Sequence, residues 1–147
     1  MRNGIRFLIL AVLVASLTMV GCSSDKLLTD EEYVSKTKAE LTEFMNVVKE
    51  GKSFHVDDYR TIQKPVEEQK RKLEKIQKNI EAIQPPPKYV DEHMQVRIVI
   101  DDFVKGDEAL LKYAKSGSGS DLATANDYFQ VGMNNMDEAP TFFTKAN

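Results

Sequence analysis

The sequence predicts an all-α protein, an antiparallel bundle of three to four helices. Two observations lead to this fold class. Apolar residues recur at spacings of three and four in four successive segments, which is the period of one face of an α-helix. The 147 residues include only 7 glycines and 5 prolines, fewer than the many turns of a β-sandwich would need. Because each amphipathic helix buries its stripe only against others, short links between them predict an up-and-down bundle.

The first helix is expected over residues 30–50. Thr29 and Glu32 have the spacing of a capping box, in which each side chain accepts a hydrogen bond from the other residue's backbone. Gly51 is expected just past the helix end, where glycine commonly adopts the left-handed conformation. The apolar stripe consists of Val34, Leu41, Phe44, Met45 and Val48.

The second helix has the most regular pattern, although Pro65 interrupts it. Either the helix starts near Lys64, with the proline in its first turn, or it starts near Val56 and kinks at the proline. The stripe reaches back to Tyr59, which favours the second alternative. This stripe consists of Tyr59, Ile62, Val66, Gln69, Leu73, Ile76, Ile80 and Ile83.

Three consecutive prolines, residues 85–87, are expected to end the second helix, because the residue before a proline avoids the α conformation. Pro87 suits the first position of a third helix, expected over residues 88–115. Its β-branched content lowers the helix propensity locally, but the helical spacing continues on both sides. The stripe consists of Tyr89, His93, Val96, Ile100, Phe103, Leu110 and Ala114.

A serine- and glycine-rich segment, residues 116–120, predicts a flexible connection that is too short to separate domains. Ser120 or Asp121 is expected to cap a fourth helix that ends near residue 136. Its apolar side consists of Leu122, Ala125, Phe129, Met133 and Met136.

The N-terminus carries a signal of a different kind. Arg2 and Arg6 precede an almost wholly apolar run, residues 7–20, and this order is typical of a secretory signal peptide. The run is shorter than the roughly 20 residues that a membrane-spanning helix needs. An uncleaved anchor, with Ile5 lengthening the run, is the alternative.

Residues 19–22 (Met-Val-Gly-Cys) resemble the lipobox of bacterial lipoproteins. The resemblance implies cleavage between Gly21 and Cys22 and attachment of diacylglycerol to the cysteine sulfur. A lone cysteine in an exported protein cannot form an internal disulfide, and lipidation explains its presence. The expected organisation is a signal peptide (1–21), a lipid-anchored tether (22–28), a bundle domain (29–136) and a C-terminal tail (137–147).

The expected location is the extracytoplasmic face of the cell membrane. Residues 73–111, with the proline-rich bend and His93, resemble small uncharacterised helical lipoproteins of Gram-positive bacteria, which implies a Gram-positive envelope and no known activity. A Gram-negative origin is the alternative, in which Ser23 would favour sorting to the outer membrane. The mature chain would keep 18 of the 20 Lys and Arg and all 23 Asp and Glu, a net charge of about −5. Such a charge argues against nucleic acid as a partner.

No enzymatic activity, metal or cofactor is expected. The sequence has no Gly-x-Ser-x-Gly and no Glu-x-x-His, and a hairpin bend at the prolines would keep His55 far from His93. We therefore expect interaction or scaffolding at the envelope, with the lipid anchor in the membrane and an unidentified protein or envelope partner. The expected contact residues are Tyr128, Phe129, Phe142 and Phe143.

Two alternatives remain open from the sequence. One is a small-ligand-binding lipoprotein in which Tyr89, His93 and Phe103 line a pocket between helices. The other is an exclusion or immunity lipoprotein, in which a tethered bundle blocks the entry of a toxin or phage.

Overall fold

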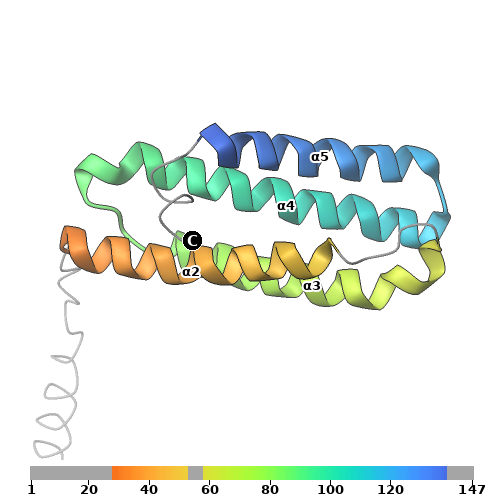
Figure 1. Ribbon diagram of the computed structural model, residues 1–147, viewed down its shortest axis with the longest axis horizontal. Coiled ribbons are helices and arrows are strands. Elements are labelled where there is room, and N and C mark those ends of the chain that lie inside the picture. Colours follow the sequence, from red (N-terminus) through yellow and green to blue (C-terminus); the bar gives the residue numbers. More distant parts are fainter. Residues whose placement is uncertain (1–27, 53–57, 139–147) are drawn as a thin grey trace, which may run out of the picture.

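The computed structural model describes residues 28–52 and 58–138 and confirms the all-α bundle. These residues form four α-helices that pack against one another, and they contain no strand (Figure 1). The helices are α2 (Asp30–Gly51), α3 (Tyr59–Glu81), α4 (Val90–Ser116) and α5 (Gly119–Glu138), with a short 3₁₀ turn, η1 (Pro87–Tyr89), directly before α4.

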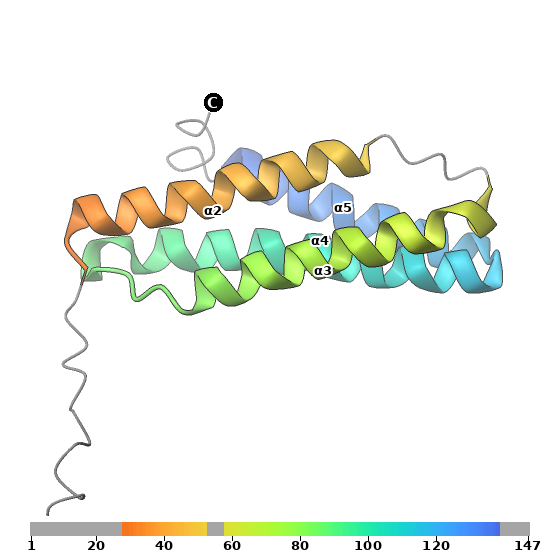
Figure 2. The same ribbon diagram turned by 90° about the horizontal axis from the view of Figure 1, so that it is seen from below.

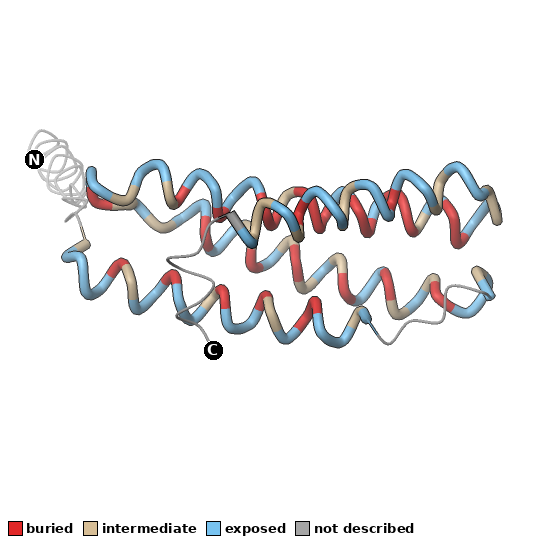
Figure 3. The backbone as a smooth tube through the Cα atoms, turned by 45° about the horizontal axis from the view of Figure 1, so that its top comes forward, coloured by how far each residue is buried: buried red, intermediate tan, exposed pale blue. Residues whose placement is uncertain are grey.

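The longest helix, α4, lies at the centre of the arrangement. It packs against α3 on one side and against α5 on the other, while α2 packs mainly on α3 (Figures 1 and 2). Helices that follow one another in the chain run antiparallel, as Figure 2 shows for α2, α3 and α4. The buried residues of each helix face its neighbours, and the exposed residues form the outer surface (Figure 3).

The start of α2 has the predicted capping box. Thr29 Oγ1 accepts a hydrogen bond from the backbone N–H of Glu32 at 3.2 Å, and Glu32 Oε2 accepts one from the N–H of Thr29 at 2.9 Å. An ion pair between Lys88 and Asp30 joins this helix end to η1. The first residues of α2 therefore lie beside the turn that connects α3 and α4.

The prediction for Gly51 is wrong, because this glycine is the last residue of α2 rather than a left-handed residue after it. Its φ is not positive, and Lys52 forms the C-cap instead. The structure gives another reason for glycine here: a Cβ would lie 2.2 Å from Oε1 of Gln69 on α3. The missing side chain allows α2 and α3 to approach closely.

Helix α3 begins at Tyr59, before Pro65, and continues through this proline, so the helix does not start near Lys64. The Asp58 side chain caps this start by accepting a hydrogen bond from the N–H of Arg60 at 3.2 Å. The helix ends at Glu81, shortly before the three prolines.

The connection between α4 and α5 is shorter and more ordered than the sequence predicted. Only Gly117 and Ser118 separate the two helices, and Gly117 adopts the left-handed conformation with φ of 67°. The Ser116 hydroxyl donates a hydrogen bond to Oδ2 of Asp121 at 2.9 Å. This bond joins the end of α4 to the first turn of α5 across the connection. Helix α5 therefore begins slightly before the predicted caps, at Gly119.

The core consists of two clusters that share α3 and α4. The first cluster adds α2 and the second adds α5. Residues buried in the first cluster include Tyr33, Leu41, Phe44, Leu73, Ile80, Val96, Ile100 and Phe103, and those in the second include Ile62, Val66, Ala109, Leu110, Tyr113 and Ala125.

Candidate functional site

The polar and aromatic residues of the predicted pocket do not all lie together. Tyr89 and His93 meet near the α3–α4 turn, where both rings contact Tyr33 of α2. The rings of Tyr33 and Tyr89 stack with centroids 4.9 Å apart, and the Tyr33 hydroxyl is hydrogen-bonded to Nδ1 of His93 at 3.2 Å. Phe103 is ten residues further along α4, about 15 Å by helical rise.

His93 is part of a packed aromatic cluster. Its side chain is only 6% exposed, and burial, followed by the charge of Arg97, lowers the pKa of its imidazole. A neutral ring is therefore favoured at neutral pH. His55, Cys22 and Gly21 lie outside the described residues. Among the residues described, no group of three or more His, Cys, Asp or Glu side chains could hold a metal ion.

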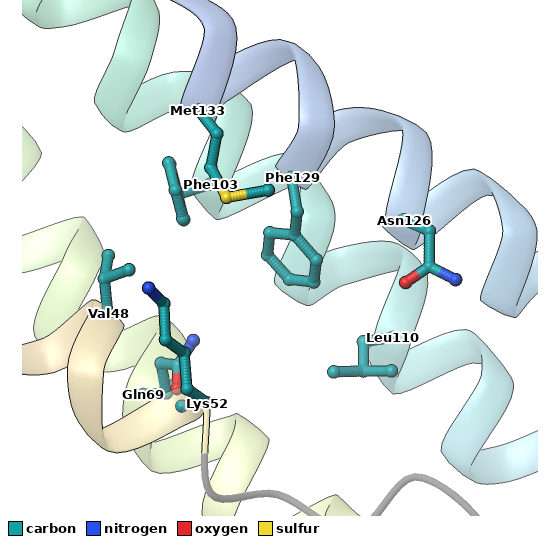
Figure 4. Close-up of a pocket in the computed structure, with 9 residues that line it drawn as sticks. Val48, Lys52, Gln69, Phe103, Leu110, Asn126, Phe129 and Met133 are labelled. Atoms are coloured by element: carbon teal, nitrogen blue, oxygen red, sulfur yellow. The ribbon is translucent and has the colours of Figure 1, made fainter. Parts of the chain in front are cut away.

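A cavity of about 280 Å³ lies elsewhere, between the end of α2 and the middle of α3, α4 and α5. Phe103 lines it, but Tyr89 and His93 do not. Of the three residues that the sequence assigned to a ligand pocket, Phe103 is therefore the one that lines this cavity. The lining consists of Val48, Gly51, Lys52, Gln69, Phe103, Leu110, Asn126, Phe129 and Met133 (Figure 4).

The walls of the cavity are mainly apolar. Phe103 and Phe129 lie side by side with ring centroids 5.7 Å apart, and Phe103 also meets Phe44 edge-on at 5.1 Å. Leu110 and Met133 complete the apolar surface from α4 and α5. Such walls favour an apolar ligand body, with the few polar groups deciding its orientation.

Among the described residues that line the cavity, Lys52 alone carries a charge, and it stands at the C-terminal end of α2. Figure 4 shows its amine directed toward the space between Val48 and Phe103. Within the described residues, no carboxylate forms an ion pair with this amine.

A buried polar pair joins the cavity wall to the core. Gln69 Nε2 donates a hydrogen bond to Oδ1 of Asp107 at 3.1 Å, and the aspartate is fully buried. Burial raises the pKa of the Asp107 carboxyl to about 8, although the hydrogen bond from Gln69 and the charge of Lys70 oppose this rise. The carboxyl is therefore mostly protonated at neutral pH. It adds little negative charge near the cavity.

The predicted contact residues on α5 have two different environments. Phe129 is half-buried against α4 and lines the cavity, and Tyr128 is also half-buried. Phe142 and Phe143 lie outside the described residues. Phe129 therefore packs against α4 and lines the cavity, and its contact with a partner stays a prediction.

The structure reveals an exposed apolar stripe that the sequence analysis did not single out. Val90, Met94 and Ile98 follow one another at intervals of four on α4 and are 46%, 55% and 46% exposed. They lie on the part of α4 that begins at η1, next to the start of α2. The sequence does contain a signal for this exposed stripe, because its three residues form a second apolar face beside the buried stripe of α4.

Comparison of the chain with protein-family models, curated proteins and solved structures finds no match. In the part of the chain that the structure describes, every helix is too short or too polar to cross a membrane.

Proposed function

We propose that this chain is a non-enzymatic lipoprotein, held by a lipid on Cys22 at the extracytoplasmic face of the cell membrane, whose bundle interacts with another envelope component. The observation that carries the proposal is the position of the single cysteine, directly after a charged and then apolar N-terminal segment. The early start of α2 supports it, because Asp30, the first residue of this helix, is only eight residues after Cys22. The bundle would be held close to the membrane.

The anchor is tested by Cys22→Ser in the native host. The control is Ser23→Ala, which changes the next residue and keeps the cysteine. Two acyl chains give stable membrane attachment, so the Cys22→Ser protein should lose its partitioning into detergent and its membrane fraction. Mass spectrometry of the N-terminal peptide should find lipid on the unaltered protein and on the Ser23→Ala control, and none on the Cys22→Ser protein. Unchanged partitioning of the Cys22→Ser protein would overturn the proposal.

The exposed stripe of Val90, Met94 and Ile98 supports an interaction role. Apolar side chains gathered on one surface are a common mark of a protein contact. This stripe begins at the bundle end that carries the start of α2, so it would face components close to the membrane.

A photo-crosslinking residue at position 94 tests this surface in living cells, with the same residue at position 75 on α3 as control. Lys75 is exposed and belongs to a different helix. We expect a discrete crosslinked product from position 94 alone. That product should disappear when Val90 and Ile98 are replaced by Gln. Equal products from both positions would contradict a specific contact.

The cavity favours a second candidate function, the binding of a small ligand. It brings residues from all four helices around one mainly apolar space. This supports the ligand-binding alternative at a position different from the one that the sequence indicated.

A further inference from the structure

We propose that the cavity between the four helices binds a small apolar carboxylate, with its hydrocarbon body against Phe103, Phe129 and Leu110 and its carboxylate beside the amine of Lys52. This inference rests on the second proposed function and specifies the chemical class of its ligand.

The size of the cavity limits the ligand. An apolar cavity of about 150 Å³ is large enough for benzene. A cavity of about 280 Å³ is nearly twice as large and fits a molecule of roughly ten to twelve non-hydrogen atoms. Short fatty acids and arylpropanoic acids have this size.

The composition of the walls determines which part of the ligand lies inside. Val48, Leu110 and Met133 offer hydrocarbon and thioether surface, and the two phenyl rings offer their faces and edges. Burying apolar surface here contributes about 25 cal/mol for each Å² removed from water. A charged ligand body would lose its hydration without compensation from these walls.

The charge of the lining determines the sign of the ligand's polar group. Of the lining residues that the structure describes, Lys52 is the one with a charged side chain, and its amine is directed toward the cavity (Figure 4). Asn126 and Gln69, the other polar side chains of the lining, are uncharged. A carboxylate at the mouth would pair with the ammonium, whereas a ligand amine would be repelled by it.

The test uses the mature chain, residues 22–147 with Cys22→Ser, which contains every described helix and requires no detergent. The probes are octanoate and octanamide, which have the same length and differ in charge. Binding is followed by NMR of ¹³C-methyl-labelled methionine, in which Met133 reports on the cavity and exposed Met94 serves as the internal control.

We expect both probes to shift the Met133 signal, with octanoate bound about fivefold more tightly, as an exposed ion pair allows. Lys52→Met should remove this preference and leave octanamide binding unchanged. The matched control is Lys49→Met, which removes a lysine from the preceding turn of α2, outside the lining. It should leave both affinities unchanged.

Two substitutions test whether the probes occupy this cavity. Met133→Trp would fill it from α5, and Asn126→Trp would cover it from an exposed position that tolerates a large side chain more easily. Each should lower the affinity for both probes at least tenfold. For these variants the signal of Phe129, labelled on its ring, replaces Met133 as the reporter.

The outcomes separate the two proposals. If neither probe shifts Met133 at millimolar concentration, ligand binding in the cavity and the carboxylate class are both wrong. If both probes bind equally and Lys52→Met changes neither affinity, ligand binding stands and the carboxylate class is overturned.

Discussion

At the scale of single residues, the surroundings of a side chain in this bundle decide whether it is charged. Asp107 is an acidic residue on the buried side of α4, and its carboxyl accepts a hydrogen bond from the side-chain amide of Gln69. A buried carboxyl without a paired cation keeps its proton, which explains the direction of its pKa shift. The carboxyl therefore contributes to the core as a neutral group.

This protonation makes stability depend on pH. The folded protein keeps the Asp107 proton up to about pH 8, whereas the unfolded chain releases it near the usual value of 3.8. Between these values the folded state binds more protons, so the free energy of unfolding should fall as pH rises, by at most about 1.4 kcal/mol per unit. Asp107→Asn should flatten this slope in urea unfolding followed by circular dichroism.

Asp91→Asn is the control, because it removes an exposed carboxyl from the same helix. It should leave the slope of the wild-type protein unchanged. The charges near Asp107 come from Lys70 and from the carboxylates that pair with it, Glu74 and Glu108. Parallel slopes for Asp107→Asn and the wild type would contradict a protonated Asp107.

The buried hydrogen bond between Gln69 and Asp107 could be predicted only in part from the sequence. Gln69 stood in an otherwise apolar stripe, and a polar residue at a core position indicates a buried hydrogen bond. Its partner could not be predicted, because the register between α3 and α4 depends on the packing of both helices. The role of Gly51 was missed for the same reason, since the Gln69 amide beside it comes from another helix.

At the scale of elements, helix starts and stripes were predictable because they depend on neighbouring residues. The capping box at Thr29 follows from two positions three residues apart. Replacing Thr29 by Ala should therefore lower the free energy of unfolding by about 1 kcal/mol, as loss of an N-cap usually does. Thr29→Ser keeps the hydroxyl and should retain most of the stability in urea unfolding; equal losses would contradict the capping role.

The close approach of α4 and α5 depends on glycine instead. A Cβ on Gly106 would lie 2.3 Å from Cε1 of Phe129, and one on Gly132 would lie 2.9 Å from the ring of Phe103. Alanine usually stabilises a helix by about 1 kcal/mol relative to glycine, but overpacking costs about 1–3 kcal/mol. Sequence patterns show the glycines without showing which side chain faces them.

We expect Gly106→Ala to lower the free energy of unfolding by about 1–2 kcal/mol despite its better helix propensity. Gly119→Ala is the matched control, because nothing lies within 4 Å of its added Cβ and its φ is not positive. The control should be neutral or slightly stabilising in the same urea titration. If adding Phe129→Leu to Gly106→Ala restores no stability, the clash with this ring is not the cause.

At the scale of the whole molecule, the cavity follows from the arrangement of four helices. Helix α2 helps to bury one part of the α3–α4 pair and α5 another, and the cavity lies where the end of α2 meets the middle of α5. The stripes of the four helices predicted the bundle. They could not predict this space, because its size depends on where each helix ends and on the angles at which all four cross.

Because of this cavity, we expect the same substitution at two neighbouring valines of α2 to change the free energy of unfolding in opposite directions. Val48 lines the cavity, whereas Val47 is buried in the core beside it. The extra methylene in Val48→Leu can enter the cavity and should raise the free energy of unfolding by up to about 0.8 kcal/mol. In Val47→Leu the same methylene enters filled space and should lower it by about 1–3 kcal/mol. Urea unfolding at pH 7 measures both changes, and equal losses at the two positions would mean that the cavity is closed in solution.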